Sequence, residues 1–436
     1  MSALASPPQR PSQAPPTRDE PVPLARRAPR PLPRRFHAGT HPPFAIRWFG
    51  STALLGHLRH LIASFVASES VDTRDWMRPQ QAASLLRTTT RVLRASADGA
   101  TLAEALGRPV WIDFVADTGD DRDVSAAVAR LVARSYSLEE GGETRHLPRG
   151  DLLVFGGDTA YPVSTADELE RRLTEPWNEV LRETYDDGRR RVLLAVPGNH
   201  DWYDGLDGFA RLFRRGAEPT RDDDDRPAPR PGARKRKARS KTGMVARQLH
   251  LDEVRESLGL LGRLVLILRA FFKGEGVRRR RRLGLRGYEA VQECSYFALP
   301  LAPGLDLWGV DRQLRTVDFR QRSFFARRRE QRPDARIVFL ASDPASAFGE
   351  RNAPGAKALT YCDLRMERDP LLYLSGDMHH YERRIFGPSV HLIAGSGGAF
   401  LHGTRIRPGP GGEPACAYPD GRTSRALVVH VPLRMM

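Results

Sequence analysis

The apolar residues of the chain follow two different patterns. Between residues 48 and 66 they recur at helical spacing with polar residues between them, which predicts an amphipathic helix. From residue 110 onward, short apolar runs alternate with helical stretches, and many of the runs are followed by Gly, Asp, Asn or His. The runs are 110–116, 152–155, 192–196, 296–299, 305–310, 337–341, 371–374, 390–394 and 427–431. This alternation predicts an α/β fold, and the number of runs predicts two sheets.

Two segments break this pattern and suggest domain limits. Residues 1–43 are rich in Pro and Arg and bury too little apolar surface to offset chain entropy, which predicts a disordered arm. Residues 44–104 are expected to form a helical N-terminal region, and residues 105–436 the α/β domain. At about 214–287 an acidic block, a Pro/Arg/Lys block, an apolar stretch and an arginine run predict a basic, partly disordered insertion. Its apolar stretch is shorter than the ~20 residues that cross a bilayer, so it fits a lid helix or an interfacial anchor.

The charge balance narrows the choice of partner. The chain carries 69 Lys and Arg against 53 Asp and Glu, a formal net charge of +16, which attracts anionic substrates, lipids or nucleic acid. No aromatic residues interleave with the arginine runs, as base stacking would require. Nucleic acid is therefore less favoured than a phosphoester substrate or an anionic membrane surface bound through the insertion.

Cysteine usage and the beginning of the chain bear on location. The three cysteines have no CxxC spacing, which predicts neither a disulfide framework nor a zinc ribbon. The first residues lack the basic, apolar and small-residue succession of a secretory signal. We therefore expect a cytoplasmic protein, with membrane association left open by the insertion.

Candidate chemistry lies where four of the apolar runs end. The four segments are DFVADTGD, FGGDTAY, VPGNHDWYDG and LSGDMHHYE. In a layered α/β protein, loops at the carboxyl ends of strands collect in one crevice. Two-metal hydrolysis needs a bridging carboxylate, further oxygen and nitrogen ligands, and a position for water. Residues of these types are Asp117, Asp158, Asn199, Asp377, His379 and His380.

Each of these residues also has a simpler explanation. Asp117 alone fits a helix N-cap or a turn aspartate equally well, and paired histidines are usually surface residues or satisfied core residues. The glycines before Asp158, Asn199 and Asp377 would let the backbone turn sharply where each strand ends. Because all four segments occur together and in this order, the sequence predicts a metal site.

In that order the segments resemble the motifs of the calcineurin-like metallophosphoesterase superfamily, with the first motifs in the form of its purple-acid-phosphatase relatives. The resemblance extends from residue 113 to about residue 402. It implies a four-layer β-sandwich flanked by helices and two metal ions (Mn, Fe, Mg or Zn). By this resemblance Asp117 and Tyr161 bind the first metal and Asp158 bridges the two. Asn199 would bind the second metal.

The resemblance also implies a reaction. Water activated by the two cations would attack the phosphorus atom of a phosphoester in line with the leaving group. His200 would stabilise or protonate that leaving group, and Asp201 would orient the His200 imidazole. The expected function is therefore hydrolysis of a phosphomonoester or phosphodiester.

The sequence departs from the family pattern at the second metal. The family's GHxH appears as GDMHH, so Asp377 stands at the first histidine. His379 matches the second histidine, which by the resemblance binds the first metal. The expected middle histidine is missing from VFLASDPAS, where Asp343 is the nearest replacement. If both aspartates bind metal, the second site is rich in oxygen and favours manganese or magnesium over zinc; otherwise it is weak or empty.

Several alternatives stay open. Asp343 fits a turn before Pro344 as well as a ligand, and His380 could face the metal in place of its neighbour because adjacent residues of an extended segment point opposite ways. The changed second site also fits an inactive descendant acting as a peripheral membrane or scaffold protein. A nuclease or nucleotide phosphodiesterase is the third alternative.

Overall fold

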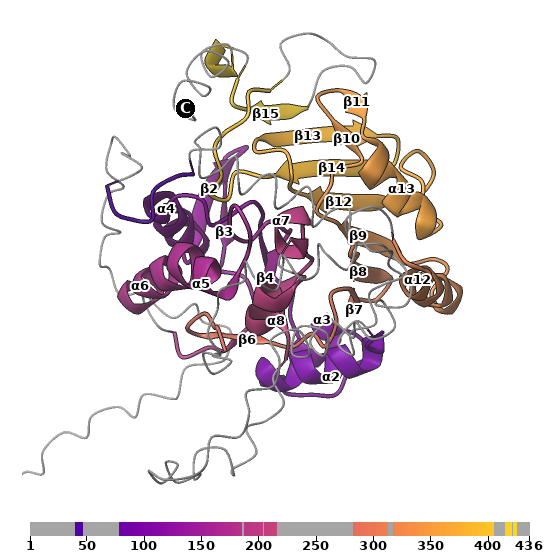
Figure 1. Ribbon diagram of the computed structural model, residues 1–436. Helices are drawn as coiled ribbons and strands as arrows, with labels where there is room; N and C mark the ends of the chain where they lie inside the picture. Colours follow the sequence, from indigo (N-terminus) through magenta and orange to yellow (C-terminus); the bar gives the residue numbers. More distant parts are fainter. Residues whose placement is uncertain are drawn as a thin grey trace, which may run out of the picture. The chain divides into compact units, whose positions relative to one another are not determined.

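The computed structural model describes residues 40–46, 78–184, 187–203, 205–215, 282–312, 317–404, 415–420 and 422–424 (Figure 1). The chain divides into residues 1–37 and residues 38–436, and all described elements belong to the second unit. Most of the predicted arm, the predicted helix at 48–66, most of the insertion and the last apolar run lie outside the described residues.

The first sheet contains four parallel strands. Their order is β1 (Ile112–Val115), β4 (Leu152–Phe155), β5 (Arg191–Ala195) and β6 (Tyr288–Ala290). Every residue of β4 and β5 is buried, as expected for inner strands of a parallel sheet covered on both faces. The apolar runs in the sequence predicted β1, β4 and β5, whereas no run predicted the short β6, which directly follows the insertion.

One face of this sheet packs against helices. Leu153 and Phe155 belong to a hydrophobic cluster with Trp177 and Phe209, which lie on α6 (Glu175–Glu183) and α8 (Asp207–Phe213). The helices α4 (Arg122–Val132), α5 (Ala166–Leu169) and the π-helical turn η3 (Glu170–Thr174) complete this side. Phe155 and Trp177 stack with ring centroids 5.4 Å apart, so this cluster fixes the first sheet to its helices.

The opposite face of the same sheet packs against a second sheet. Leu152 and Val154, which alternate with the residues above, share a cluster with Phe297 and Leu307 of that second sheet. This division follows from the two-residue repeat of a strand, which sends neighbouring side chains to opposite faces. The helices α2 (Ala82–Val92) and α3 (Leu102–Leu106) contribute Leu85 and other side chains to the same cluster.

The second sheet is mixed. Its seven strands are β15 (Cys416–Tyr418), β13 (Tyr381–Phe386), β14 (Ser389–Ala394), β12 (Leu371–Ser375), β9 (Arg336–Leu340), β8 (Leu305–Gly309) and β7 (Phe297–Ala302), in that order. The pairs among β14, β12, β9 and β8 are parallel, and the pairs toward both edges are antiparallel. The predicted α/β fold with two sheets is thus confirmed at the level of a mixed α/β protein.

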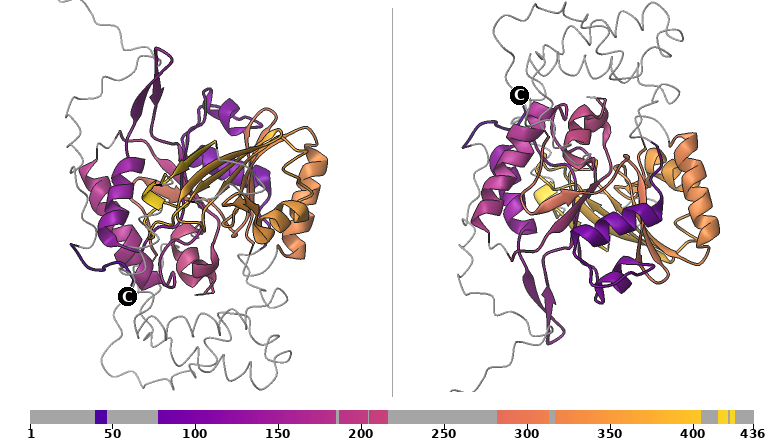
Figure 2. Two further views of the ribbon diagram at one scale, coloured as in Figure 1. Left: turned by 90° about the horizontal axis from the view of Figure 1, so that it is seen from above. Right: turned by 90° about the horizontal axis from the view of Figure 1, so that it is seen from below.

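The outer face of the second sheet is covered by α12 (Phe319–Gln331) and α13 (Ala353–Tyr361). Phe339 and Tyr373 of the sheet share a cluster with Phe325 of α12 and Leu359 of α13. In Figure 2 the orange helices and the magenta helices lie on opposite sides of the strands. Among the described residues, no helix has the length and apolar composition needed to cross a membrane.

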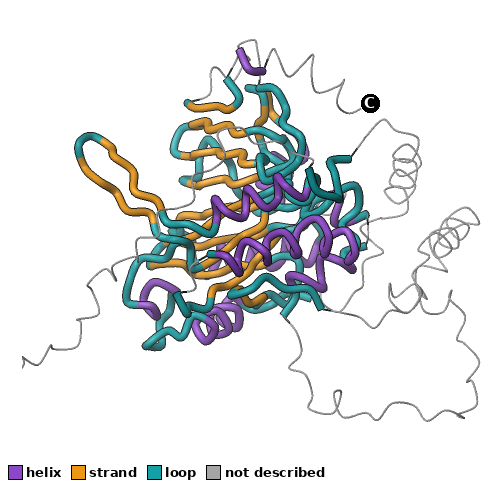
Figure 3. Tube along the Cα trace, turned by 90° about the vertical axis from the view of Figure 1, so that its left-hand side faces the viewer, coloured by secondary structure: helices purple, strands orange, loops and turns teal. Residues whose placement is uncertain are grey.

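One hairpin stands apart from these layers. The strands β2 (Tyr136–Glu140) and β3 (Glu143–Leu147) pair only with each other, and they project from the described part of the chain (Figure 3). The hairpin's sequence, YSLEEGGETRHL, contains no continuous apolar run, so the sequence pattern did not predict it. A second small hairpin joins β10 (Ser346–Ala347) and β11 (Glu350–Arg351).

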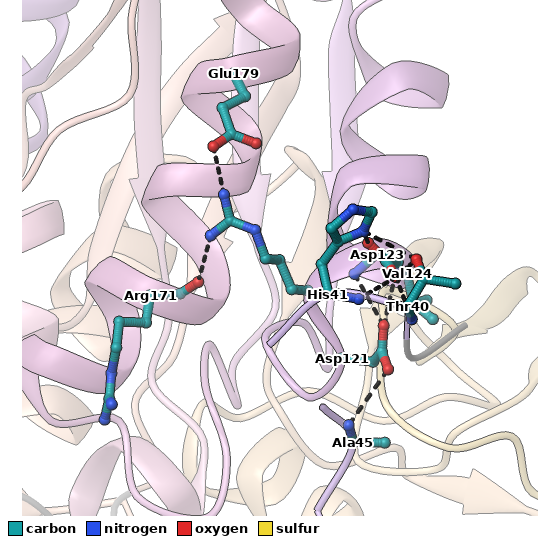
Figure 4. Close-up of polar contacts among 9 residues, drawn as sticks. Thr40, His41, Ala45, Asp121, Asp123, Val124, Arg171 and Glu179 are labelled. Carbon is teal, nitrogen blue, oxygen red and sulfur yellow. Dashed lines mark hydrogen bonds and ion pairs between the residues drawn. The ribbon is translucent and has the colours of Figure 1, made fainter. Parts of the chain in front are cut away.

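The segment 40–46 is fixed to the start of α4 (Figure 4). The backbone amide of Thr40 donates to Asp123 Oδ2 at 2.7 Å, and His41 Nδ1 lies 2.9 Å from Asp123 Oδ1. The Ala45 amide donates to Asp121 Oδ2 at 3.3 Å, and Asp121 also caps α4. Residues 40–43, which the sequence assigned to the arm, therefore have a defined place on the domain.

Candidate metal centre

The predicted site residues follow strands of both sheets. Asp117, Asp158 and Asn199 come after β1, β4 and β5, and Asp343 and Asp377 come after β9 and β12. The strands within each group are parallel, so their carboxyl ends lie at one edge. Hydrogen bonds join the two edges, because the Asp377 amide donates to both oxygens of Asp117 at 3.1 and 2.9 Å. Residues 260 positions apart in the chain thus meet in one place.

Three of these aspartates have a left-handed backbone conformation. Their φ angles are 56° at Asp117, 49° at Asp158 and 65° at Asp377. A non-glycine residue in this region costs roughly 1–2 kcal/mol, and Asp tolerates it better than most. The same strained turn therefore follows three strands, as is often seen where backbone geometry serves a functional site.

Glycines near these aspartates leave space for the aspartate carboxylates. A Cβ atom on Gly198 would lie 2.1 Å from Asp158 Oδ1, and one on Gly376 would lie 2.5 Å from Asp117 Oδ2. Of the three glycines that the sequence assigned to sharp turns, only Gly157 has a positive φ, of 105°. The sharp turns are made by the aspartates themselves, and glycines at 198 and 376 leave room for their carboxylates.

Asp117, Tyr161 and His379 form one connected group. The Tyr161 hydroxyl donates to Asp117 Oδ1 at 3.2 Å and lies 3.1 Å from His379 Nε2. His379 Nε2 is 3.9 Å from Asp117 Oδ1. The other ring nitrogen, Nδ1, is 3.0 Å from the Phe400 carbonyl and must donate to it, since a carbonyl only accepts. The Nε2 lone pair is therefore directed at Asp117 and Tyr161, the orientation usual for a metal-binding histidine.

Burial and like charges dominate the electrostatics of this group. Burial and the nearby Asp377 raise the pKa of Asp117 well above its usual value. Burial and the Asp117 charge do the same to the pKa of Asp158. Burial, assisted by His402, lowers the pKa of His379 to about 3, so its ring is neutral at physiological pH. Crowded carboxylates with a neutral imidazole form an environment that a bound cation would stabilise strongly.

His200 and Asp201 lie in the short helix α7 (Asn199–Trp202), which follows β5. The His200 amide donates to Asp158 Oδ1 at 2.9 Å, and the ring's Nδ1 is 2.7 Å from the Pro162 carbonyl. Asp201 is fully buried and accepts hydrogen bonds from Gly198 N at 2.8 Å and from Thr159. The orienting contact to the imidazole that was expected from Asp201 is thus made by the Pro162 carbonyl. Asp201 instead joins the loops after β4 and β5.

The remaining candidates lie toward the second sheet. Asn199 Nδ2 donates to the Tyr203 hydroxyl at 2.9 Å. Asp343 accepts from Ser342 Oγ at 3.0 Å and forms a close ion pair with Arg312 Nε. Asp377 is largely buried, and burial together with Asp343 raises its pKa to about 7, although the Arg312 charge acts in the opposite direction. Asp343 is therefore an ion-paired carboxylate as well as a residue before Pro344.

His380 does not join the group around Asp117. Its ring is fully buried, lies 4.9 Å from the Phe348 ring centroid and has Nε2 3.7 Å from Glu382. Neither of its ring nitrogens has a hydrogen-bond partner. Of the two adjacent histidines, His379 faces Asp117, so the alternative orientation in which His380 faces that position is not observed.

The sequence did not identify Arg312 as part of this region. Arg312 follows β8, which pairs with β9, and β9 leads to Asp343. The sequence signal was the arginine of WGVDRQL, directly after β8. To predict its contact with Asp343 one would need the strand order, because the pairing of β8 with β9 brings residues 312 and 343 together.

The side chains around Asp117 offer oxygen and nitrogen atoms to a metal ion. In the described ranges, no three side chains of His, Cys, Asp or Glu have the spacing of a metal site. The group around Asp117 includes a tyrosine oxygen and one imidazole nitrogen, with Asp158 beside it. Its oxygen and nitrogen donors suit a divalent transition metal or Mg²⁺. Asp117, Tyr161, His379 and Asp158 thus supply donor atoms of the kinds that such an ion prefers.

Comparisons with known proteins add little to this geometry. No family model matches the chain, and no curated protein is similar to it. Among solved structures, a protein described as GAP50, the anchor in the inner membrane complex of Plasmodium, is similar with 11% sequence identity and a TM-score of 0.35. That match covers 68% of this chain and 74% of the other chain. A likeness at this level carries no argument about fold family or function.

Proposed function

We propose that this chain is a metal-dependent phosphoesterase of the calcineurin-like type. The observation that carries the proposal is the meeting of Asp117, Tyr161 and His379, whose oxygen and nitrogen atoms lie 3.1–3.9 Å apart. These residues occupy the positions that the resemblance assigns to the first metal. They come from loops after β1, β4 and β12, as expected if separate motifs serve one site.

The layering of the fold supports the same proposal. One hydrophobic cluster lies between the α4–α8 helices and the first sheet, a second between the two sheets, and a third between the second sheet and α12 and α13. Three such interfaces correspond to four layers, helix, sheet, sheet and helix. This layering supports the proposal, because the resemblance implies a four-layer sandwich.

A bound metal ion would have two roles in this reaction. When bound, a divalent ion would lower the pKa of a water molecule and offset negative charge on the phosphoryl group. Asp117, Asp158, Tyr161 and His379 would hold it, because His379 is kept neutral by burial and the two carboxylates are crowded together. The hydrogen bond from His379 Nδ1 to Phe400 would keep the ring in its binding orientation.

His200 is placed to act on the leaving group. The contact from Nδ1 to the Pro162 carbonyl and the flanking rings of Tyr161 and Tyr203, at 4.5 and 5.1 Å between centroids, fix the imidazole. A water oxygen would bond to phosphorus as the bond from phosphorus to the leaving oxygen breaks. With Nδ1–H donated to Pro162, the doubly protonated His200 ring would give its Nε2 proton to that oxygen. The attacking water would lose a proton to solvent, and solvent would then protonate Nε2 again. The products are an alcohol and a phosphate or phosphomonoester.

Hydrolysis of p-nitrophenyl phosphate and bis-p-nitrophenyl phosphate tests this function. Metal-stripped protein is resupplied with manganese, magnesium, zinc or iron, and an Asp158→Asn variant is assayed beside it. We expect metal-dependent turnover that falls at least ~100-fold in the variant, because the amide cannot supply the carboxylate charge. The preferred substrate would show whether the enzyme acts on monoesters or diesters.

Asp113→Asn is the matched control. Asp113 is a largely buried aspartate of β1 that accepts a hydrogen bond from the Gly150 amide at 2.8 Å, and it lies outside the group around Asp117. Turnover should survive in this variant. If metal binds but neither substrate is hydrolysed with any ion, the inactive scaffold alternative replaces the proposal.

A further inference from the structure

Arg312 occupies the region where the resemblance would put a second metal ion. Its Nε pairs with Asp343, and the two side chains are only 12% and 7% exposed. The Arg312 charge also acts on Asp377, the other aspartate that replaces a family histidine. A positive charge supplied by the chain itself is therefore already present beside both carboxylates.

The backbone around Arg312 is held firmly. Its neighbour Asp311 is fully buried and accepts hydrogen bonds from Trp202 Nε1, at 2.9 Å, and from Ser295. The side-chain amide of Gln321 binds both backbone groups of Asp311, at 3.0 and 2.7 Å. Trp202 and His200 belong to the same short helix, α7. Arg312 is thus anchored to both sheets next to the candidate site and is not a surface residue that happens to reach it.

Electrostatics argue against a guanidinium and a second divalent ion at the same carboxylates. Arginine stays charged in proteins and is a good partner for buried carboxylates. A divalent ion at Asp343 would have to displace this ion pair or lie close to a like charge. At the short distances of a buried site such repulsion is strong. In the group around Asp117, by contrast, the carboxylate of Asp117 is contacted by the Tyr161 hydroxyl, the Asp377 amide and the His379 ring.

We propose that Arg312 replaces the second metal ion of this site, so that the protein binds one divalent ion, with the Arg312 guanidinium serving as the second positive charge. This inference rests on the proposed function, since it assumes a metal at Asp117, Asp158, Tyr161 and His379. It accounts for the two departures from the family pattern together: Asp343 and Asp377 are carboxylates because their partner is a guanidinium, which binds carboxylate and not imidazole.

Metal stoichiometry tests the inference without relying on activity. The full-length protein is stripped, loaded with Mn²⁺ and measured by isothermal titration calorimetry, elemental analysis and electron paramagnetic resonance. We expect one ion per chain and the spectrum of an isolated Mn²⁺. In Arg312→Gln the carboxylates of Asp343 and Asp377 lose their cation, so we expect a second ion to bind and a spin-coupled pair to appear.

Two further variants sharpen the result. Arg312→Lys keeps the charge and should keep the stoichiometry at one. Arg328→Gln removes an arginine that is also 12% exposed and paired with a buried aspartate, Asp306, but far from the site in the fold, on α12; it too should bind one ion. These controls separate loss of the charge at position 312 from general disturbance of a buried ion pair.

The outcomes distinguish this inference from the proposed function. Two ions in the wild-type protein would overturn the role of Arg312 and leave the phosphoesterase proposal standing. A single ion in both the wild type and a folded Arg312→Gln variant would also overturn it. If no ion binds to the wild type, the proposed function fails and this inference fails with it. Should Arg312→Gln not fold, the wild-type stoichiometry still decides.

Discussion

At the scale of single residues, the sequence predicted best those contacts in which both side chains belong to recognised family motifs. Asp117, Tyr161 and His379 were assigned to one metal, and they are hydrogen-bonded neighbours in the structure. Arg312 could not be assigned in this way, because its contact with Asp343 depends on strand order and no family motif marks it. Asp201 was expected to orient the His200 ring, but the backbone carbonyl of Pro162 makes that contact. The sequence could not show this, because every residue has a backbone carbonyl.

Asp377 leads to a prediction about stability and pH. Its pKa is about 7 in the fold and about 3.9 in an unfolded chain, so between these values the folded state binds more protons. The stability it contributes therefore falls as pH rises from about 4 to about 7. Asparagine cannot ionise, and Asp377→Asn should stabilise the metal-free protein by roughly 1–2 kcal/mol at pH ~5 and about 4 kcal/mol at pH ~8. Urea unfolding at both pH values measures this difference.

A control variant, Asp187→Asn, should change the free energy of unfolding in the opposite direction. Burial raises the pKa of Asp187, but the hydrogen bonds from Arg191 and from the Arg189 amide, together with the charges of Arg191 and Arg149, outweigh burial and lower the pKa. The stability that Asp187 contributes is present above its unfolded pKa and is lost at acid pH, so Asp187→Asn should destabilise the protein at neutral pH. Equal effects of Asp377→Asn at both pH values would contradict the raised pKa of Asp377.

At the scale of secondary-structure elements, strands that are buried on both faces were predicted well. Continuous apolar runs matched β4 at residues 152–155 and overlapped β5, both of which are buried at every position and apolar on both sides. Apolar runs also overlapped β8, β9, β12 and β14, although buried and half-buried positions alternate along β12 and β14. The hairpin of β2 and β3 has mixed polar residues and exposed positions, so it lacks this signal. The short edge strands β6 and β15 were missed for the same reason: with few residues and one exposed edge, they need tertiary pairing to form.

The hairpin gives a prediction about elements. Tyr136 and Leu138 are 40% and 50% exposed, and Tyr136 pairs with Leu147 at the base of the hairpin, so a short turn can connect the same two points. Replacing residues 137–146 with Gly-Gly should change the melting temperature by less than ~3 °C, since no cluster of buried apolar residues includes the hairpin. Calorimetry measures this, and a loss of more than ~10 °C would mean that the hairpin stabilises the domain.

At the scale of the whole molecule, the candidate site joins two sheets that are otherwise held together by an apolar cluster. The polar links include Asp377 N to Asp117 and Trp202 to Asp311. The two-sheet α/β fold was predicted from the apolar runs, and the meeting of the four segments was expected because loops at the carboxyl ends of strands collect in one crevice. The packing of the two sheets into one sandwich was expected only from the resemblance. Local patterns specify strands, but the packing of one sheet on another depends on contacts distant in sequence.

Hydrogen exchange with and without metal tests whether the site connects the two sheets. An ion held by Asp117 and Tyr161 from one side and by His379 from the other must be released before either sheet edge opens. Metal at about 100 times its dissociation constant adds about 2.7 kcal/mol, so amides in both sets of loops should exchange up to ~100-fold more slowly. The amides of His200 and Asp377, each hydrogen-bonded to a site carboxylate, are the most direct reporters. Amides of the β2–β3 hairpin should not respond, and protection confined to the loops of one sheet would mean that the ion does not bridge them.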